Sequence, residues 1–305
     1  MKKVAVLNDL SGLGKCSLTA AIPVLSVMGV QACPLPTAVL SAQTGFSSYY
    51  YDDYTRHIEE IIREWKKMDF CPDGIYTGFL AGDIQAERVL DFVKEFQQKD
   101  TKVLVDPVLG DNGEEYPMYT ESLCGRMRCL AKRASIITPN LTEALLLLYG
   151  QDKMHEIWAD LTKTVKNRTQ ESAEETKKKS AKADRKCFEE TVEQIGTALA
   201  EQFQTEVVIT GIDIPQEDGG MKIGNLICRE DCAEWIVSLK EGGSYSGTGD
   251  LFASVLCAGM VKGTDTALSV KKAVQFLSKA IHDTVLEGTD RNEGVCFETY
   301  LHELY

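Results

Sequence analysis

The chain has 305 residues, of which 44% are hydrophobic and 26% are charged, and its formal net charge is −13. This length can bury a substantial core, either as one large α/β domain or as two smaller ones. The acidic balance argues against a nucleic-acid partner or an anionic membrane partner, because both surfaces require a basic footprint.

Nothing in the sequence predicts export or membrane insertion. Residues 1–9 turn polar too early for a signal peptide, and no apolar run approaches the length of a membrane span. We therefore expect a cytoplasmic protein. Cys33 and Cys257 lie inside apolar runs, and Cys228 and Cys232 have no second pair at zinc-ligand spacing, so we interpret the ten cysteines as buried thiols.

Short apolar runs alternate with amphipathic stretches along most of the chain, which predicts parallel strands joined by helices. Strands are expected at residues 4–7, 30–35, 74–80, 103–105, 135–138 and 206–210, with an antiparallel pair at 223–228 and 234–239. Helices are expected after a first loop at 8–17 and at 54–68, 84–97, 118–132, 188–203, 250–261 and 267–285. The fold class is therefore α/β, a doubly wound and mostly parallel sheet flanked by helices, with a short antiparallel addition.

Two segments depart from this alternation. Residues 151–186 are dominated by Lys, Glu, Thr, Ser and Ala and have little apolar content after Leu161. This composition predicts an exposed helix or a mobile insertion within a single domain of residues 1–305. Tyr49, Tyr50 and Tyr51 form a second unusual segment, which we expect to be partly exposed or to lie at an interface.

The stretch 246–253 is the strongest candidate for chemistry, because a polar, glycine-rich turn runs directly into an apolar helix. The free N–H groups at such a helix start form an anion site, and phosphate is the expected anion. A carboxylate at Asp250, beside that site, suits the removal of a proton from a hydroxyl group that attacks phosphorus. The alternative is that Thr248 or Asp250 only caps the helix.

Other strand ends also carry polar residues. Asp106 directly follows a buried strand, and Pro107 explains the exit geometry but not the acid. Asn140 and Glu143 are spaced as a capping box, which is a sufficient structural reason for both. Because the carboxyl ends of parallel strands share one edge, we expect these residues to meet the 247–250 turn in one cleft. An anion hole, one acid and further carboxylates for Mg²⁺ together favour phosphoryl transfer from a nucleotide to an alcohol.

Several motifs, in consistent order, resemble those of the ribokinase superfamily. They are Ser41-x-x-Thr44-Gly45, Asp106-Pro107-Val108-Leu109-Gly110-Asp111, Thr138-Pro139-Asn140-x-x-Glu143 and Gly247-Thr248-Gly249-Asp250. Within that superfamily, the chain most resembles the pyridoxal/pyridoxamine kinases of vitamin B6 salvage. The resemblance covers residues 4–285 and is interrupted by the polar insertion.

The resemblance implies a role for each matched position. Asp250 would be the base for the 5′-hydroxyl of a B6 vitamer (pyridoxal, pyridoxamine or pyridoxine), and the amides of Gly247, Thr248 and Gly249 would stabilise the transferred phosphoryl group. The remaining implied sites are Asp106 and Glu143 for the metal, Asn140 and Thr210 for ATP, and Asp9, Gln43, Thr44 and Phe79 for the vitamer. Such kinases use ATP with Mg²⁺, often with a monovalent cation such as K⁺, and are usually homodimers.

Some positions depart from the pyridoxal kinase pattern. That pattern has Ser and Tyr where this chain has Asp9 and Phe79. The loop from Asp9 to Gly14, together with Gln43, resembles instead the hydroxymethylpyrimidine kinases of thiamine synthesis. Those enzymes commonly have Cys at the position of Asp250 and lack the Gly110-Asp111 continuation, so the B6 substrate is favoured. The alternatives are hydroxymethylpyrimidine (phosphate) kinase and a non-catalytic vitamer-binding protein.

Overall fold

The computed structural model describes residues 1–166, 174–216, 220–230 and 232–305, and the side chains in these ranges other than those of 163–184. Its main sheet has the strand order β11-β10-β9-β8-β5-β4-β1-β2-β3. The strands are β1 (Lys2–Ser11), β2 (Val30–Leu40), β3 (Tyr51–Asp53), β4 (Gly74–Thr77), β5 (Lys102–Val105), β8 (Ile136–Ile137), β9 (Glu206–Pro215), β10 (Met221–Arg229) and β11 (Cys232–Leu239).

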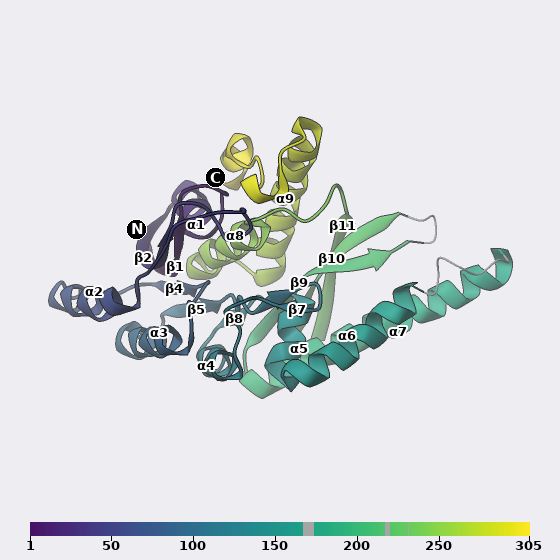
Figure 1. Ribbon diagram of the computed structural model, residues 1–305, viewed down its shortest axis with the longest axis horizontal. Coiled ribbons are helices and arrows are strands. Elements are labelled where there is room, and N and C mark those ends of the chain that lie inside the picture. The colour runs from purple at the N-terminus through teal and green to yellow at the C-terminus, as the bar shows by residue number, and fades with distance from the viewer. Residues whose placement is uncertain (167–173, 217–219, 231) are drawn as a thin grey trace.

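Helices cover both faces of this sheet. They are α1 (Ser17–Val27), α2 (Thr55–Lys67), α3 (Asp83–Phe96), α4 (Glu121–Ala131), α5 (Leu141–Tyr149), α6 (Gln151–Lys166), α7 (Glu174–Phe203), α8 (Thr248–Lys262) and α9 (Thr266–Glu287), followed by the 3₁₀ turns η2 (Arg291–Glu293) and η3 (Glu298–Leu304). In Figure 1, α1, α8 and α9 lie above the strands, and α2 to α7 lie below them. The fold class predicted from the sequence is confirmed.

The alternation of apolar side chains along β1 explains the two layers. Val4 and Val6 pack into the core beneath α1, α8 and α9, whereas Ala5 and Leu7 pack into the core with α3, α4, α5 and α7. Successive side chains of a strand point to opposite faces, so a continuous apolar run is buried on both sides. β1 pairs in parallel with both β2 and β4, which makes it a central strand.

Antiparallel strands extend the sheet at both ends. β10 pairs antiparallel with β9 and with β11, as the sequence predicted for the terminal pair, and β3 pairs antiparallel with β2. A separate two-stranded hairpin joins β6 (Gly110–Asp111) to β7 (Glu114–Glu115). Its turn residues Asn112 and Gly113 both have positive φ, at 53° and 81°, as a tight hairpin turn requires.

The first part of the 151–186 segment packs on the core. Met154 of α6 is fully buried, and the partly buried Trp158 and Leu161 pack against the same core. A Cβ atom at Gly113 would lie 2.2 Å from the indole nitrogen of Trp158, so α6 also contacts the β6–β7 turn. Residues 167–173 of the expected insertion lie outside the described residues.

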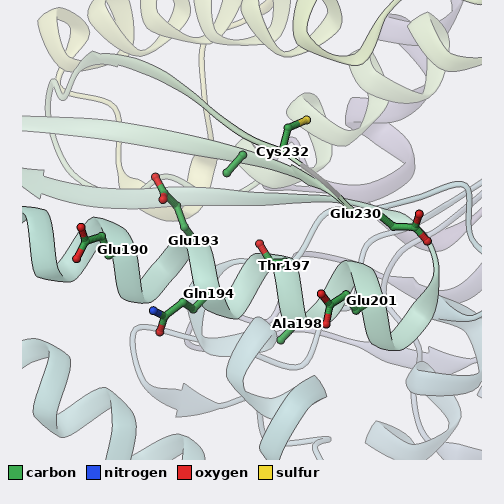
Figure 2. A pocket seen from close by; sticks show the side chains of 9 residues that line it. Glu190, Glu193, Gln194, Thr197, Ala198, Glu201, Glu230 and Cys232 are labelled. Carbon is green, nitrogen blue, oxygen red and sulfur yellow. The ribbon is translucent and has the colours of Figure 1, made fainter.

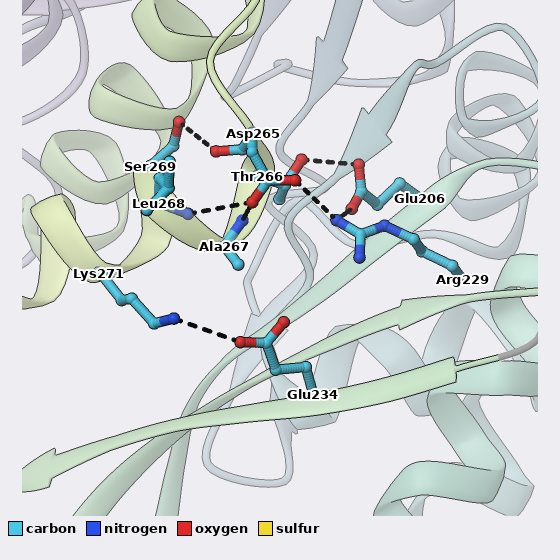
Figure 3. Close-up of polar contacts among 9 residues, drawn as sticks. All are labelled: Glu206, Arg229, Glu234, Asp265, Thr266, Ala267, Leu268, Ser269 and Lys271. Carbon is cyan, nitrogen blue, oxygen red and sulfur yellow. Dashed lines mark hydrogen bonds and ion pairs between the residues drawn. The ribbon is translucent and has the colours of Figure 1, made fainter.

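Ion pairs fasten the start of α9 to the sheet, as Figure 3 shows. Asp265 accepts hydrogen bonds from the backbone N–H groups of Ala267 at 2.9 Å and Leu268 at 3.3 Å. Arg229 of β10 lies 2.8 Å from Glu206 and 3.7 Å from Asp265. These contacts hold the start of α9 at the amino end of β9, on the side of the sheet opposite the carboxyl ends of the parallel strands.

Two sequence expectations need correction. β1 runs to Ser11, so Asp9 lies within the strand and not in the loop that follows it. β9 runs to Pro215, so Thr210 lies inside that strand and not at its end. The interpretation of the cysteines as buried thiols holds for Cys16, Cys124, Cys228 and Cys257 but is wrong for the exposed Cys71, Cys129, Cys187 and Cys232. Free cysteine is among the residue types most often buried, but the packing around each position, and not the residue type alone, determines its exposure.

Tyr49, Tyr50 and Tyr51 are exposed, as predicted. Among the described residues, no helix combines the length and the apolar content needed to cross a membrane.

The contact between β4 and α8 generates a stability prediction. A Cβ atom at Gly74 would lie 2.4 Å from Cγ1 of Val261, so we expect Gly74→Ala to overpack this contact and to lower the free energy of unfolding by about 1–3 kcal/mol. Gly125→Ala in α4 is the matched control, since no atom lies within 4 Å of its Cβ position, and it is expected to stabilise by about 0.5–1 kcal/mol. Urea melts of both variants test this; equal melting of Gly74→Ala and the unsubstituted protein would contradict the packing.

Candidate active site

Polar residues line the carboxyl edge of the parallel strands. Thr210 lies in β9, Thr138 follows β8, Asp106 follows β5, Thr77 ends β4 and Asn8 lies near the end of β1. Since the strand order is β9-β8-β5-β4-β1, these five residues follow one another along a single edge. The convergence expected from the sequence is therefore present, and the start of α8 joins it through Asp250.

Asn8 holds Asp250. Its Nδ2 donates a hydrogen bond to Oδ1 of Asp250 at 3.0 Å, and its Oδ1 accepts from the backbone N–H of Phe79 at 2.8 Å. Asn8 is fully buried, and Gly78 leaves room for it, since a Cβ atom at Gly78 would lie 2.4 Å from Nδ2. Sequence reasoning missed this residue, although an amide at the end of the apolar run 4–7 was a usable signal.

The turn before α8 is built from close backbone contacts. Gly247 is the N-cap of α8 with φ at 79°, and a Cβ atom there would lie 2.2 Å from the carbonyl oxygen of Lys15. Only glycine satisfies both conditions. No side chain caps this helix, so the alternative that Thr248 or Asp250 serves as the cap is wrong. The first N–H groups of an α-helix have no acceptor within the helix, so the amides of Thr248 and Gly249 can hold an anion.

Asp106 and Glu143 form the second acidic group. Thr138 donates its hydroxyl to Oδ1 of Asp106 at 3.1 Å. Glu143 is buried, and its two carboxylate oxygens accept the backbone N–H groups of Leu109 at 3.1 Å and Asn140 at 2.9 Å. Asn140 accepts the N–H of Glu143 in return, so the predicted capping box is confirmed.

Asn140 and Thr210 lie side by side. Asn140 forms an isolated parallel bridge with Thr210, whose N–H donates to the carbonyl of Pro139 at 2.9 Å. The Asn140 amide also donates to the carbonyl of Gly110 at 2.8 Å, which ties α5 to the β6–β7 hairpin. The two residues predicted for nucleotide binding therefore share one end of the sheet edge.

Four carboxyl groups influence one another along this edge. Burial raises the pKa of Asp250 to about 6, and the negative charge of Asp9 contributes to this rise. Burial also raises the pKa of Asp106 to about 7, and the negative charge of Asp250 contributes there. Burial and the charge of Asp106 raise the pKa of Glu143 well above its ordinary value. A row of acids that resists full ionisation is a place where a bound cation is electrostatically favoured.

The four predicted vitamer-binding residues are not equally available. Both carboxylate oxygens of Asp9 accept serine hydroxyls, from Ser11 at 2.7 Å and from Ser17 at 2.5 Å. Gln43 uses its amide within the protein, with Nε2 directed to Asn292 and Oε1 accepting the N–H of Gly45 at 2.7 Å. Thr44 is exposed, whereas Phe79 is half-buried and adjoins Asn8 through its backbone.

A hollow of about 530 Å³ lies away from this edge, between α7 and the turn that joins β10 to β11 (Figure 2). Its lining includes Glu193, Glu201, Glu230 and Cys232, and none of the residues predicted for the site lines it. Cys228 of β10 pairs with Val207 of β9, so the β10–β11 turn lies at the amino edge of the sheet. The hollow is therefore separate from the candidate active site.

A half-buried acid beside a helix N-terminus with free amides, at the carboxyl edge of a doubly wound sheet, suits phosphoryl transfer to a hydroxyl group. The fold and the site together are those of a small-molecule kinase, and comparison with known proteins specifies the family.

The sequence profile of phosphomethylpyrimidine kinase matches residues 14–177 and 169–294, so the chain belongs to this family. A solved structure of a candidate phosphomethylpyrimidine kinase from Bacteroides thetaiotaomicron is 33% identical with a TM-score of 0.82, and the match covers 99% of this chain and 93% of that one. Another crystal form described by the same name, determined with pyridoxal, is 34% identical with a TM-score of 0.81, covering 99% and 95% of the two chains.

More distant relatives carry the pyridoxal kinase name. A candidate pyridoxal kinase of Schizosaccharomyces pombe is 24% identical over 298 residues, which cover 92% of this chain and 83% of that protein. Pyridoxal kinase from Leishmania donovani, solved with ADP and pyridoxine, has the same fold, with a TM-score of 0.75 and 21% identity over 99% of this chain and 95% of that one. The resemblance read from the motifs is confirmed.

The raised carboxyl pKa values predict a stability effect. A carboxyl whose pKa is higher in the folded state binds its proton more readily than in the unfolded chain, so stability falls as pH rises from about 4 to about 7. Asp106→Asn removes this cost, and we expect it to raise the melting temperature at pH 8 by about 3 °C for each kcal/mol recovered, without metal or nucleotide. Asp100→Asn, at an exposed position, is the control and should leave the melting temperature unchanged. A fall in the melting temperature of Asp106→Asn would contradict the electrostatic interpretation.

Proposed function

We propose that the protein transfers the γ-phosphoryl group of ATP to the 5′-hydroxymethyl group of a B6 vitamer. The observation that carries this proposal is the half-buried carboxylate of Asp250, held by Asn8 at 3.0 Å in the first turn of α8. An acid with this placement has no capping role in the helix, and it adjoins the amides that would receive a phosphoryl group. A purely binding protein has no use for a proton acceptor at that point.

The proposed reaction assigns one role to each group. The hydroxyl oxygen of the vitamer attacks the γ-phosphorus as its bond to the ADP oxygen breaks, and the hydroxyl proton passes to Asp250. With a pKa of about 6, Asp250 is mostly ionised at neutral pH. This pKa is also close enough to neutral pH for the carboxylate to accept a proton efficiently. The N–H groups of Gly247, Thr248 and Gly249 stabilise the charge on the transferred group.

The acids at the other end of the edge fit a hard cation. Thr138 donates to Oδ1 of Asp106, and Glu143 presents carboxylate oxygens held by two backbone N–H groups. Asp106 and Glu143 would hold Mg²⁺, which neutralises phosphate charge when bound. Asn140 and Thr210 adjoin this pair and would contact ATP. The use of K⁺ stays a prediction from the family resemblance.

The choice of a vitamer as the substrate is supported by the relatives. The 34% identical relative was solved with pyridoxal, and the S. pombe relative is described as a pyridoxal kinase. The backbone N–H groups of Asp9 and Phe79 both donate to Oδ1 of Asn8, so both residues lie close to the amide that holds Asp250. The homodimer and the cytoplasmic location stay predictions.

A substrate panel tests the proposal. We expect turnover of pyridoxal, pyridoxamine or pyridoxine in a coupled ADP-release assay with Mg²⁺ and ATP, and little with hydroxymethylpyrimidine. A heat-treated sample and an Asp250→Asn sample serve as controls for contaminating kinases. Phosphorylation of the pyrimidine alone would replace the proposed substrate, and ADP release with none of the four alcohols would remove the proposal.

The ionisation of Asp250 predicts the pH dependence of turnover. Because the base must be ionised, kcat should fall by about tenfold per pH unit below pH 6. The Asn8 amide favours the ionised form, so Asn8→Ala should move this acid limb to higher pH and lower kcat by about 10- to 100-fold, the equivalent of one lost hydrogen bond to a charged group. Asp250→Asn should lose about 10² to 10⁴ in kcat at every pH while retaining ATP binding. An unchanged acid limb in Asn8→Ala would show that Asp250 is not the group that titrates.

A further inference from the structure

Residues 290–294, here called the C-terminal clamp, connect the two sides of the active site. The clamp comprises η2 and the residue on each side of it. It contacts the residues just before α8, which would face the nucleotide, and the Gln43 loop (residues 41–45), which would face the vitamer. No motif in the sequence pointed to this segment, because it lies beyond residues 4–285, over which the motifs resemble those of the family.

One residue of the clamp holds the turn before α8. The backbone carbonyl of Arg291 accepts the N–H of Ser246 at 3.0 Å, and Nε of Arg291 donates to the carbonyl of Ser244 at 3.1 Å. Ser246 directly precedes Gly247, so these bonds fix the chain that delivers the anion-binding amides. The position of those amides therefore depends on η2.

The next residue holds the Gln43 loop. Nε2 of Gln43 donates to the backbone carbonyl of Asn292 at 3.2 Å and to its side-chain Oδ1 at 3.3 Å. Oε1 of Gln43 accepts the N–H of Gly45 at 2.7 Å, and its backbone N–H donates to the carbonyl of Leu13 at 2.9 Å. Both ends of the Gln43 amide are thus used within the protein.

Glycines bring the three loops into direct backbone contact. A Cβ atom at Gly294 would lie 2.5 Å from the carbonyl oxygen of Gly14 and 3.1 Å from that of Ser246. A Cβ atom at Gly14 would lie 2.4 Å from Cγ of Gln43 and 3.1 Å from the carbonyl oxygen of Asn292. With so little space between them, a displacement of one loop must move the clamp and the other loop.

The clamp is itself anchored. Asp290 accepts the N–H of Asn292 at 2.8 Å, and Lys15 pairs with Glu298 at 3.0 Å just beyond the clamp. The first bond fixes the conformation of η2, and the ion pair links the chain after the clamp to the loop between β1 and α1. Adjacent residues of one short rigid turn therefore hold the nucleotide side and the vitamer side.

We propose that the C-terminal clamp makes vitamer binding and nucleotide binding cooperative, with Gln43 and Asn292 as positioning residues and not vitamer contacts. When a nucleotide orders the turn before α8, the clamp and the Gln43 loop become ordered with it. The vitamer then binds a loop that has already lost its conformational entropy, so its binding is tighter. This inference rests on the proposed function for the identity of the ligands but not for the coupling between the loops.

The coupling is measured as the ratio of two dissociation constants for pyridoxal, without and with the non-hydrolysable nucleotide β,γ-methylene-ATP and Mg²⁺. We expect pyridoxal to bind about fivefold tighter or more with the nucleotide. Gln43→Leu and Asn292→Ala should each bring this ratio close to one, and the double variant should add little to either single change. Gln97→Leu is the matched control, since its Nε2 also donates to a backbone carbonyl, that of Arg133, at 3.1 Å and far from the site.

Three results would overturn the proposal. They are a ratio of one in the unsubstituted protein, an unchanged ratio in both variants, and an equal loss of pyridoxal affinity with and without nucleotide in Gln43→Leu. The last would mean that Gln43 contacts the vitamer directly.

A second measurement does not depend on pyridoxal. Hydrogen exchange at the N–H groups of Gln43 and Gly45 should slow when β,γ-methylene-ATP and Mg²⁺ are added to the unsubstituted protein, and it should not change in Asn292→Ala. If pyridoxal does not bind but this protection appears, the proposed substrate is wrong and the clamp stands. If pyridoxal is phosphorylated but the nucleotide gives no protection of these amides, the clamp is wrong and the proposed function stands.

Discussion

The hydrogen bond from Asn8 to Asp250 is the contact on which the candidate active site depends. It joins the central strand β1, near its end, to the first turn of α8 through two residues that lie 242 positions apart in the chain. A carboxylate in this position loses hydration and lies near other acids, so without a buried donor its ionised form would be strongly disfavoured. The Asn8 amide and the start of α1 partly offset that cost, and the result is an acid with a pKa of about 6. The lost hydration and the nearby acids lower the stability of the folded state, and they also raise the proton affinity of this carboxylate, as a proton acceptor requires. Such a compromise between stability and activity is common at catalytic sites.

The backbone contacts around the site show how an acidic protein can prepare an anion site. With a net charge of −13, the chain has no general attraction for phosphate, and Lys15 and Lys240 near the edge are already paired with Glu298 and Asp213. The amides at the start of α8 therefore contribute positive potential of their own, and they keep their orientation because Gly247 packs on the carbonyl of Lys15. Fixed dipoles of this kind need little reorganisation during a reaction, unlike a flexible lysine in water.

Much of the architecture could be predicted from the sequence, because buried parallel strands and amphipathic helices leave strong local patterns. The run 4–7, the capping box of Asn140 and Glu143 and the antiparallel pair near residue 230 are examples, and each depends on neighbours in the chain. The motifs were also sufficient to identify the family. Predictions failed where the answer depended on distant residues. Asn8 was overlooked because its partner Asp250 is far along the chain. Four exposed cysteines were wrongly expected to be buried, since the burial of a thiol depends on packing that the local sequence does not reveal.

By itself, the sequence determined the α/β class, the order of most elements, the glycine-rich turn before α8 and the identity of its acid. These features follow from local periodicity and residue type, which the chain carries regardless of its folded contacts. Only the tertiary structure decided that the Gln43 amide donates to Asn292 and that the Asp9 carboxylate accepts hydrogen bonds from Ser11 and Ser17. It also decided that η2 joins both loops. Hydrogen-bond partners and carboxyl pKa values depend on distances between groups that are remote in the chain, and those distances exist only once the sheet has brought its strand ends to one edge.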